Sequence, residues 1–356
     1  MPTSGKKRSD DARTYRAGIV GCGRIGCGFD DEPRVTSVRT HAGGYKKSDR
    51  FELAALADLD ADLLDRYATR LEVAGRYVDY VRMLERERLD VLSVCTPNPT
   101  HREIVERAAE SGVRAIFCEK PIADSLDAAD AMVRTCREHG VLLMIDHQRR
   151  FDRMHRDAVE YVRSGKLGTI QQVTCYYTAG VANTGSHVFD LLRFFFGDVA
   201  SVRAWPSSNP SPNPADPNYD GWLQFRDGPS TALQACDVKH YVILEINILG
   251  EAGRLRIMAS GYDAQYEVVR ESDKFAGYRE LFPAATPFET PTEHEFMLQA
   301  MDHLSGCLDR GEPPISTGTD GRASLEIICA LHASAAEESR LVTLPLENSR
   351  SMIQSR

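Results

Sequence analysis

The stretch GIVGCGRIGCG, at residues 18–28, decides the fold. It contains the spacing Gly-x-Gly-x-x-Gly, at Gly21, Gly23 and Gly26, directly after an apolar run typical of a buried strand. In this context the first glycine permits a tight turn, and the second lets a pyrophosphate approach the backbone. The third lets the following helix pack closely on the strand. The stretch therefore predicts the phosphate-binding loop of a dinucleotide site, with amide donors from the helix that begins there.

The second predicted strand ends in an acid, Asp58. A carboxylate at this point accepts hydrogen bonds from the adenosine ribose and repels a 2′-phosphate. The nearby Asp60 adds repulsion, and no Arg or Ser follows that would bind such a phosphate. The sequence therefore favours NAD over NADP as the cofactor, and we expect Arg24 and Ile25 of the glycine-rich loop to contact it as well.

The segment between the last glycine and Asp58 is longer than the usual spacing of about 20 residues. The stretch GFDDEPRVTSVRT, at residues 28–40, looks like an insert before the helix resumes at HAGGYKKS. Two alternatives remain open for it. The insert covers the cofactor or lines the substrate pocket, or it is a surface loop without a function.

The first part of the chain alternates apolar runs with amphipathic helices. Helix boundaries are expected at Gly112, Ser125 and Gly140. This alternation is typical of βαβ units and predicts a doubly wound parallel sheet, an N-terminal Rossmann domain over residues 15–147. The polar residues 1–14 before it are expected to form a flexible tail.

From residue 148 the pattern changes to closely spaced strands with few helices between them. It predicts a second, α+β domain over residues 148–356 with a large, mostly antiparallel open sheet. We expect this domain to bind the substrate and to form oligomers. A Pro-, Asn- and Ser-rich loop at residues 207–218 contains no evident packing residues and is expected to be mobile.

Composition excludes several classes of function. The net charge of −9 argues against a nucleic-acid groove and against binding to anionic membranes. No apolar run is long enough to span a membrane, and the N-terminus has no signal-peptide core. Nine cysteines, without zinc-ligand spacing, are expected to be reduced thiols in the cytoplasm and to hold no metal.

The stretch CEKPIA, at residues 118–123, places Glu119 and Lys120 at the end of a predicted strand. Ligands of open parallel sheets bind outside the carboxyl ends of the strands. An ammonium group there can hold a substrate hydroxyl and stabilise a developing alkoxide. The alternative is an ordinary surface lysine before a turn.

Over residues 16–346 the chain resembles the glucose–fructose oxidoreductase, inositol dehydrogenase and MocA family of nicotinamide-dependent oxidoreductases. The resemblance rests on seven stretches: GIVGCGRIG, SVCTPNPTH, CEKPIA, HQRRFD, GTIQQV, GSHVFDLLRFFFGDV and ISTGTDGRASLEIICALHASAAEES. It implies that Lys120 lies beside the nicotinamide and the reacting carbon, and that Glu119 also borders the cofactor. It further implies that the loop TPNPTH packs along the nicotinamide half of the cofactor. The cofactor residues expected in that loop are Thr96, Pro97, Asn98 and His101, although His101 is more typical of a cap or packing residue than of a catalyst.

The stretch NTGSHVFDLLRFFFG, at residues 183–197, carries the second catalytic element that the resemblance implies. His187 matches the family's proton donor or acceptor. Four residues earlier, where inositol dehydrogenases often have Asp, this chain has Asn183, which resembles the sugar-nucleotide oxidoreductases of the family. An amide can orient a hydroxyl but cannot take a proton, so proton transfer would depend on His187. Asp190 is expected to orient His187 or bind substrate, or else to be a buried structural acid.

Arg149 and Arg150 follow the last Rossmann strand. One of them, with Arg150 preferred, is expected to bind a substrate carboxylate or phosphate, and an ion pair between the domains is the alternative.

The resulting hypothesis is an NAD-dependent oxidoreductase of a secondary alcohol or ketone in a sugar-like substrate: a polyol, sugar acid or nucleotide sugar. One alternative keeps NAD bound for a transient oxidation, with glycoside cleavage or elimination as the net reaction. Another is a non-catalytic dinucleotide sensor. Because the open sheet needs cover, notably along residues 241–250, we also expect a homodimer or homotetramer, as in the family.

Overall fold

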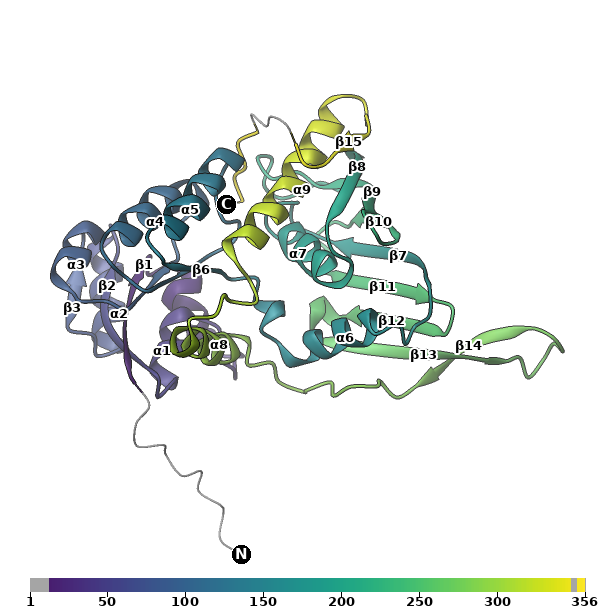
Figure 1. Cartoon of the computed structure of the whole chain (residues 1–356), viewed down its shortest axis with the longest axis horizontal. Coiled ribbons are helices and arrows are strands. Elements are labelled where there is room, and N and C mark those ends of the chain that lie inside the picture. The colour runs from purple at the N-terminus through teal and green to yellow at the C-terminus, as the bar shows by residue number, and fades with distance from the viewer. Residues whose placement is uncertain (1–12, 347–350, 356) are drawn as a thin grey trace, which may run out of the picture.

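The computed structural model describes residues 13–346 and 351–355. The flexible tail predicted for residues 1–14 lies outside the described residues, except for its last two. Two modules lie side by side, and each is built on one sheet (Figure 1).

The first module is a six-stranded parallel sheet with strand order β3-β2-β1-β4-β5-β6. This order reverses direction between β1 and β4, as in the Rossmann fold, and confirms the predicted doubly wound sheet. The strands are β1 (Tyr15–Val20), β2 (Phe51–Ala57), β3 (Gly75–Tyr77), β4 (Val91–Val94), β5 (Ala115–Cys118) and β6 (Leu142–Ile145). The helices are α1 (His41–Lys47), α2 (Ala61–Arg70), α3 (Tyr80–Arg86), α4 (His101–Glu110) and α5 (Leu126–Glu138).

Local sequence explains these elements. Strands β4 and β5 are apolar almost throughout and fully buried, because helices cover both faces of a parallel sheet. Helix α5 begins where the Ser125 side chain accepts a hydrogen bond from the Ala128 amide, which confirms the predicted N-cap. The predicted stops at Gly112 and Gly140 follow the last residues of α4 and α5.

The second module is a nine-stranded sheet with the order β14-β13-β12-β11-β7-β10-β9-β8-β15. All neighbouring strands are antiparallel except β7 and β10, which confirms a mostly antiparallel open sheet. The strands are β7 (Ile170–Tyr177), β8 (Val199–Pro206), β9 (Tyr219–Phe225), β10 (Ser230–Ala235), β11 (Leu244–Gly250), β12 (Gly253–Met258), β13 (Asp263–Glu271), β14 (Arg279–Ala284) and β15 (Val342–Thr343). Its helices are α6 (Arg153–Arg163), α7 (Gly185–Phe196) and α9 (Gly318–Ala336), whereas α8 (Phe296–Arg310) packs against α1 and the core of the first module (Figure 1).

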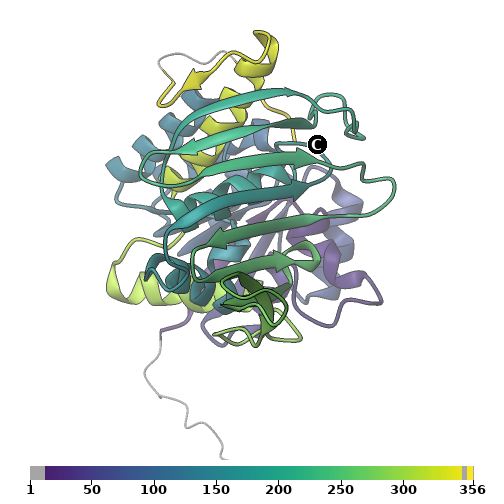
Figure 2. The same cartoon turned by 90° about the vertical axis from the view of Figure 1, so that its right-hand side faces the viewer.

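One face of the nine-stranded sheet packs on helices, and the other has no helix in front of it (Figure 2). Strand β11 shows how the side chains are distributed. Leu244, Ile246 and Ile248 are buried in the core, whereas the alternating Glu245 and Asn247 are only half-buried. Three of the apolar side chains that seemed to need cover in residues 241–250 therefore face the protein's own core, whereas Tyr241 and Val242 are exposed.

Two features differ from the sequence-based expectations. Strands β13 and β14 were not predicted, and they form a hairpin that projects from the edge of the sheet (Figure 1). Their polar composition lacks the alternation that marks a half-buried strand. The loop at 207–218 does contain packing residues, because Asp216 and Asn218 are buried and hydrogen-bonded.

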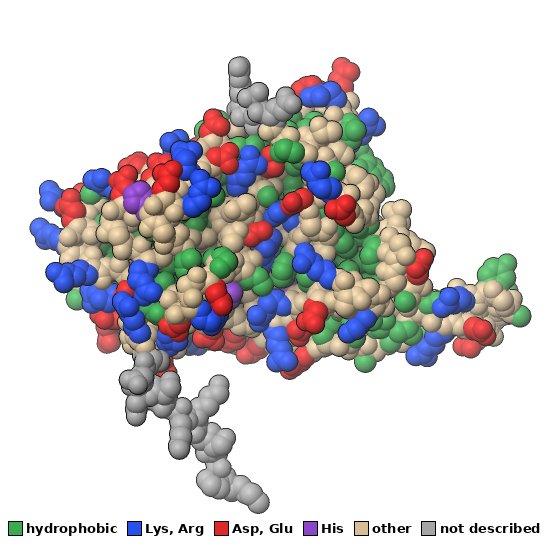
Figure 3. All heavy atoms as spheres, viewed as in Figure 1, with side chains coloured by type: hydrophobic (Ala, Val, Ile, Leu, Met, Phe, Trp, Pro, Cys, Tyr) green, Lys and Arg blue, Asp and Glu red, His purple; other side chains and the backbone are tan. Residues whose placement is uncertain are grey.

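The surface drawn in Figure 3 carries acidic and basic side chains interspersed over both modules. Within residues 13–346 and 351–355, no helix is both long enough and apolar enough to cross a membrane.

Candidate active site

The glycine-rich loop has the geometry that a dinucleotide phosphate requires. Gly21 has a φ of +98°, and a Cβ there would lie 2.8 Å from the backbone of Cys95. A Cβ at Gly26 would overlap the carbonyl oxygen of Gly21, so only glycine lets the two segments pack. A Cβ at Gly23 would meet no described atom within 4 Å, so the backbone there is open to a ligand. These residues fit an NAD pyrophosphate.

The helix expected after the loop is reduced to one π-helical turn, Arg24–Gly28. Ile25 in this turn is half-buried, and Arg24 is exposed with its guanidinium 4.5 Å from the centre of the Phe29 ring. The amide donors near the phosphates therefore come from a single turn, and the regular helix α1 begins only at His41.

Asp58 holds two backbone segments together at the carboxyl ends of β1 and β2. One carboxylate oxygen accepts from the Cys22 amide at 2.6 Å, and the other accepts from the Asp60 amide at 2.9 Å. Each oxygen retains a second lone pair that a ribose hydroxyl can use. The residue predicted to bind ribose thus also fixes the shape of the glycine-rich loop, and Asp60 is the N-cap of α2.

The insert at 28–40 is tied to both modules. Asp31 accepts from Arg66 and Tyr67 of α2 and pairs with Arg70. At its far end, Val38 donates its amide to Glu295, and Arg39 bonds to the Tyr262 hydroxyl at 3.3 Å.

This insert therefore runs from the helix that follows Asp58 to the second module. That path disfavours an unattached surface loop, and a contact of the insert with the cofactor or the substrate stays a prediction.

The loop after β4 is held by its own side chains. Asn98 is buried and donates both amide protons inside the protein, to the carbonyls of Ala123 and Ile353. His101 is buried between the carbonyls of Thr96 and Ile122, at 2.7 and 3.1 Å.

Asn98 and His101 thus fix the shape of the loop. For His101 this agrees with the expectation of a cap or packing residue. Thr96 is half-buried and Pro97 exposed at the same strand end, and a cofactor contact by any of the four residues stays a prediction.

Glu119 belongs to a buried cluster with His41 and Asp146. Its Oε1 lies 3.2 Å from His41 Nε2, its Oε2 accepts from the Lys120 amide, and Asp146 Oδ2 lies 3.7 Å from the same His41 nitrogen. Burial, the largest single effect, opposes ionisation of Glu119, but the interactions with His41, Lys120 and Asp146 together outweigh it and lower the pKa to about 2. Burial and the ionised Glu119 raise the pKa of Asp146 well above its usual value.

The three groups lie within 4.8 Å of one another, a grouping that metal sites share, but their contacts are also those of a hydrogen-bonded network. Glu119 thereby supports the backbone of Lys120 from inside the protein. Sequence reasoning missed His41 and Asp146 because they are distant in the chain from the Glu-Lys-Pro element.

Lys120 meets the second catalytic element across the two modules. Its Nζ donates to the backbone carbonyl of Asn183 at 3.0 Å. His187 follows on the first turn of α7, and both Lys120 and His187 are half-buried. The structure therefore brings Lys120 to the backbone of Asn183, four residues before His187, and the joint action of Lys120 and His187 stays a prediction.

Asp216 is a component of this site that sequence reasoning missed. Its two carboxylate oxygens accept from the amides of Ala182 and Asn183, at 2.7 and 2.9 Å. Burial raises the pKa of Asp216 to about 6, against the lowering effect of the two amides and of nearby Lys120. The only sequence signal was an acid at the end of a proline-rich loop.

Arg150 and Asp190 form a buried ion pair. Arg150 Nε donates to both carboxylate oxygens of Asp190, at 3.0 and 2.9 Å, and Nη1 donates to the carbonyl of Ile315. The pair joins the end of β6 to α7, so it is the ion pair between the domains that was the alternative to substrate binding. Arg149 donates to the Ser260 carbonyl at 2.8 Å. Substrate contact by Arg150 or Asp190 stays a prediction, and what the structure shows is a brace for the helix that carries His187.

Comparisons with known proteins agree with this geometry. A family model described as an oxidoreductase family with an NAD-binding Rossmann fold matches residues 15–147. A second, described as the C-terminal alpha/beta domain of the oxidoreductase family, matches residues 159–344.

Among curated relatives, a D-apiose dehydrogenase of Paraburkholderia graminis is 28% identical over 340 residues, covering 88% of this chain and 87% of the relative. A 2,7-anhydro-N-acetylneuraminate hydratase of Mediterraneibacter gnavus is 30% identical, covering 74% of this chain and 83% of the relative. Among solved structures, the WlbA dehydrogenase of Bordetella pertussis, in complex with NADH and UDP-GlcNAcA, has a TM-score of 0.77 at 22% identity. That match covers 94% of this chain and 99% of the other, and it shows a shared fold.

Proposed function

The chain belongs to the glucose–fructose oxidoreductase, inositol dehydrogenase and MocA family of NAD-binding oxidoreductases, and on this premise we propose that it interconverts a secondary alcohol and a ketone in a sugar-like substrate. The observation that carries the proposal is the contact between Lys120 and Asn183, since it unites the strand end beside the cofactor edge with the helix that bears His187. The D-apiose dehydrogenase relative supports a substrate of this class.

Each residue has a distinct role in the proposed reaction. When bound, NAD supplies the hydride acceptor or donor. Lys120 donates a hydrogen bond to the reacting oxygen and stabilises the negative charge that develops there. His187 takes the hydroxyl proton during oxidation and returns it during reduction. Asn183 orients a neighbouring hydroxyl, and the Arg150–Asp190 ion pair fixes α7 so that His187 keeps its position.

A second candidate keeps the cofactor bound and has no net redox reaction. The relative named as a hydratase favours it, because that protein is 30% identical to this chain over 312 residues. The path of the insert at 28–40, from α2 to the second module, would also suit a retained cofactor.

A substrate screen separates the two candidates. The purified enzyme is incubated with NAD and a panel of polyols, aldoses, sugar acids and nucleotide sugars, and the nicotinamide absorbance is followed beside product analysis. Accumulating NADH supports the dehydrogenase. Product formation without NADH supports the second candidate. Turnover of no panel member by either readout argues against a sugar-like substrate.

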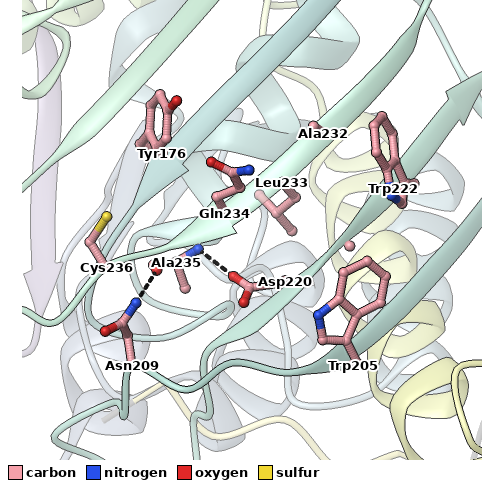
Figure 4. Close-up of a pocket in the computed structure, with 11 residues that line it drawn as sticks. Tyr176, Trp205, Asn209, Asp220, Trp222, Ala232, Leu233, Gln234, Ala235 and Cys236 are labelled. Carbon is pink, nitrogen blue, oxygen red and sulfur yellow. Dashed lines mark hydrogen bonds between the residues drawn. The ribbon is translucent and has the colours of Figure 1, made fainter.

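Assembly through the helix-free face of the nine-stranded sheet is part of the same proposal. A pocket of about 380 Å³ lies on this face, and the indole rings of Trp205 and Trp222 stand on it (Figure 4). These side chains are 37% and 46% exposed, more than bulky aromatic groups in a core. Light scattering of the wild type should give a dimer or tetramer, and Trp222→Lys should shift it toward the monomer, while a monomeric wild type contradicts assembly.

We also place the enzyme in the cytoplasm. The support is that all nine cysteines are free thiols in the structure. Formation of disulfides in the protein isolated under thiol-blocking conditions would contradict this placement.

A further inference from the structure

His147 is a buried histidine whose ring nitrogens have no hydrogen-bond partner. It follows the end of β6, and its side chain is 2% exposed. Neither Nδ1 nor Nε2 makes a hydrogen bond to any part of the chain that the structure describes. The nearest carboxylate oxygen belongs to Asp190, 3.8 Å from Nε2, which is beyond hydrogen-bond distance.

His147 lies at the carboxyl ends of the parallel strands, near the residues proposed for catalysis. Strand β6 is the direct neighbour of β5, which ends two residues before Lys120. On the other side, Asp190 is on α7, three residues after His187. His147 therefore stands between the two elements that carry the proposed catalytic residues, although it belongs to neither sequence motif.

An unpaired imidazole in such a place is unfavourable for the fold alone. A buried polar group left without a partner destabilises the folded state, and buried groups of this kind in native proteins need an explanation. An apolar side chain that fits this space would avoid that destabilisation. The retention of two unpaired nitrogens indicates that another molecule supplies their partners.

The ring is suited to a hydroxyl group. The charged groups around it are Asp190, Arg150, Asp320 and Lys120, and burial, the largest effect, lowers the pKa of His147. A neutral imidazole offers one donor and one acceptor. A sugar hydroxyl both donates and accepts, so it can satisfy either nitrogen.

We propose that His147 is a substrate-binding residue that holds a hydroxyl of the sugar-like substrate beside the one that Lys120 and His187 act upon. The inference rests on the proposed function, because the ligand is the substrate of that site. His147 would then be a second imidazole near the reacting hydroxyl, in a site where Asn183 has replaced the Asp that inositol dehydrogenases often have.

The test compares two buried histidines. His147→Phe keeps an aromatic ring, slightly larger than imidazole, and removes both nitrogens, and His147→Gln keeps a polar group. The control is His332→Phe, because His332 Nδ1 is satisfied by the Tyr219 hydroxyl at 3.0 Å on the far side of α9. Thermal unfolding is measured for each variant. NADH-loaded protein is then titrated by calorimetry with sorbitol, D-xylose, D-gluconate and UDP-glucose as probes.

A substrate-binding role predicts opposite effects for the two histidines. His147→Phe should keep or raise the melting temperature. It should weaken the affinity for the best probe at least about 10-fold, which equals about 1.4 kcal/mol and is typical of one lost hydrogen bond. The affinity of His147→Gln should lie between those of the wild type and His147→Phe. His332→Phe should lower the melting temperature and leave probe affinity unchanged.

If His147→Phe lowers the melting temperature and binds the probe normally, the histidine is structural and the inference is overturned. If no probe binds the wild type, the sugar-like substrate itself is rejected and the inference falls with it.

Discussion

The ammonium of Lys120 donates to the backbone carbonyl of Asn183 at 3.0 Å, across 63 residues of sequence and two sheets. An ammonium has three donors, so a carbonyl that holds one of them sets the direction of the others. That carbonyl is itself placed by Asp216, which accepts from the Asn183 amide. The direction of the Lys120 ammonium thus depends on the loop at 207–218, which contains Asp216 but no proposed catalytic side chain.

Asp216→Asn tests this dependence. The substitution replaces one acceptor oxygen by a donor, so the amide of Ala182 or Asn183 is left without a partner. We expect a loss of about 1–3 kcal/mol in unfolding free energy and a fall of about 10-fold or more in kcat, with NAD affinity little changed. Asp220→Asn is the control, since Asp220 also accepts one backbone amide, that of Ala235, but on the open sheet face. Equal kcat in both variants would show that Asp216 does not position Lys120.

Asp58 should make NAD the preferred cofactor. Its charge repels a 2′-phosphate, so kcat/KM should be higher with NAD than with NADP, and Asp58→Ala should narrow the ratio. The variant should also weaken both cofactors, because the Cys22 amide loses its acceptor. Asp62→Ala, an exposed acid in the first turn of α2, should leave the ratio unchanged. A wild-type preference for NADP contradicts the assignment.

The buried acids behind Lys120 should respond unequally to substitution. Burial and the charge of Glu119 raise the pKa of Asp146 and so favour its neutral form, which an amide resembles, and Asp146→Asn should change the unfolding free energy by less than about 1 kcal/mol. Glu119 is ionised beside His41, so Glu119→Gln should cost about 1–3 kcal/mol. Urea unfolding at neutral pH measures both. The reverse order of effects would mean that Glu119, and not Asp146, is the acid that an amide can replace.

Stability should decrease at alkaline pH through His294. Burial, the largest single effect, opposes protonation of His294, but its hydrogen bonds to Asp152, at 3.0 Å, and to the Tyr262 carbonyl, with the charge of Asp152, together outweigh it and raise the pKa. Its contribution is therefore complete below the unfolded value of about 6.5 and is lost as pH rises through the higher folded value. Burial likewise opposes ionisation of Asp152, yet bonds from His155 and His294 lower its pKa, so its contribution is lost only in strong acid.

Urea unfolding near pH 6 and near pH 8.5 checks this sign. Wild type should lose more stability between the two values than His294→Gln, which cannot titrate. A larger loss in the variant would assign the alkaline effect to other groups.

Much of the first module could be predicted from sequence, because its signals are local. Alternating apolar runs and helices predict the parallel sheet, and the roles expected of Gly21 and Gly26 depend on backbone within a few residues or on the adjacent strand. Lys120 and Asn183 lie in two separate motifs, and only the family resemblance implied that both motifs serve the same site.

The remaining parts depend on contacts between distant segments. Asp216 ends a loop whose composition suggests mobility, and only the folded chain shows which amides it holds. His41 and Asp146 approach Glu119 from separate elements of the sheet module. The hairpin of β13 and β14 has too little apolar alternation to be recognised before its pairing is seen.

The central claim is that Lys120 and His187 act on one substrate oxygen. The most direct measurement is steady-state kinetics of Lys120→Met, His187→Ala and the double variant on the substrate found by the screen, with NAD titration of each protein. The account predicts that each single variant loses roughly 10²–10⁴ in kcat, and that the double variant loses much less than the product of the two losses. His187→Ala should bind NAD normally. Near-normal kcat in both folded single variants would contradict the account and place the reaction centre elsewhere.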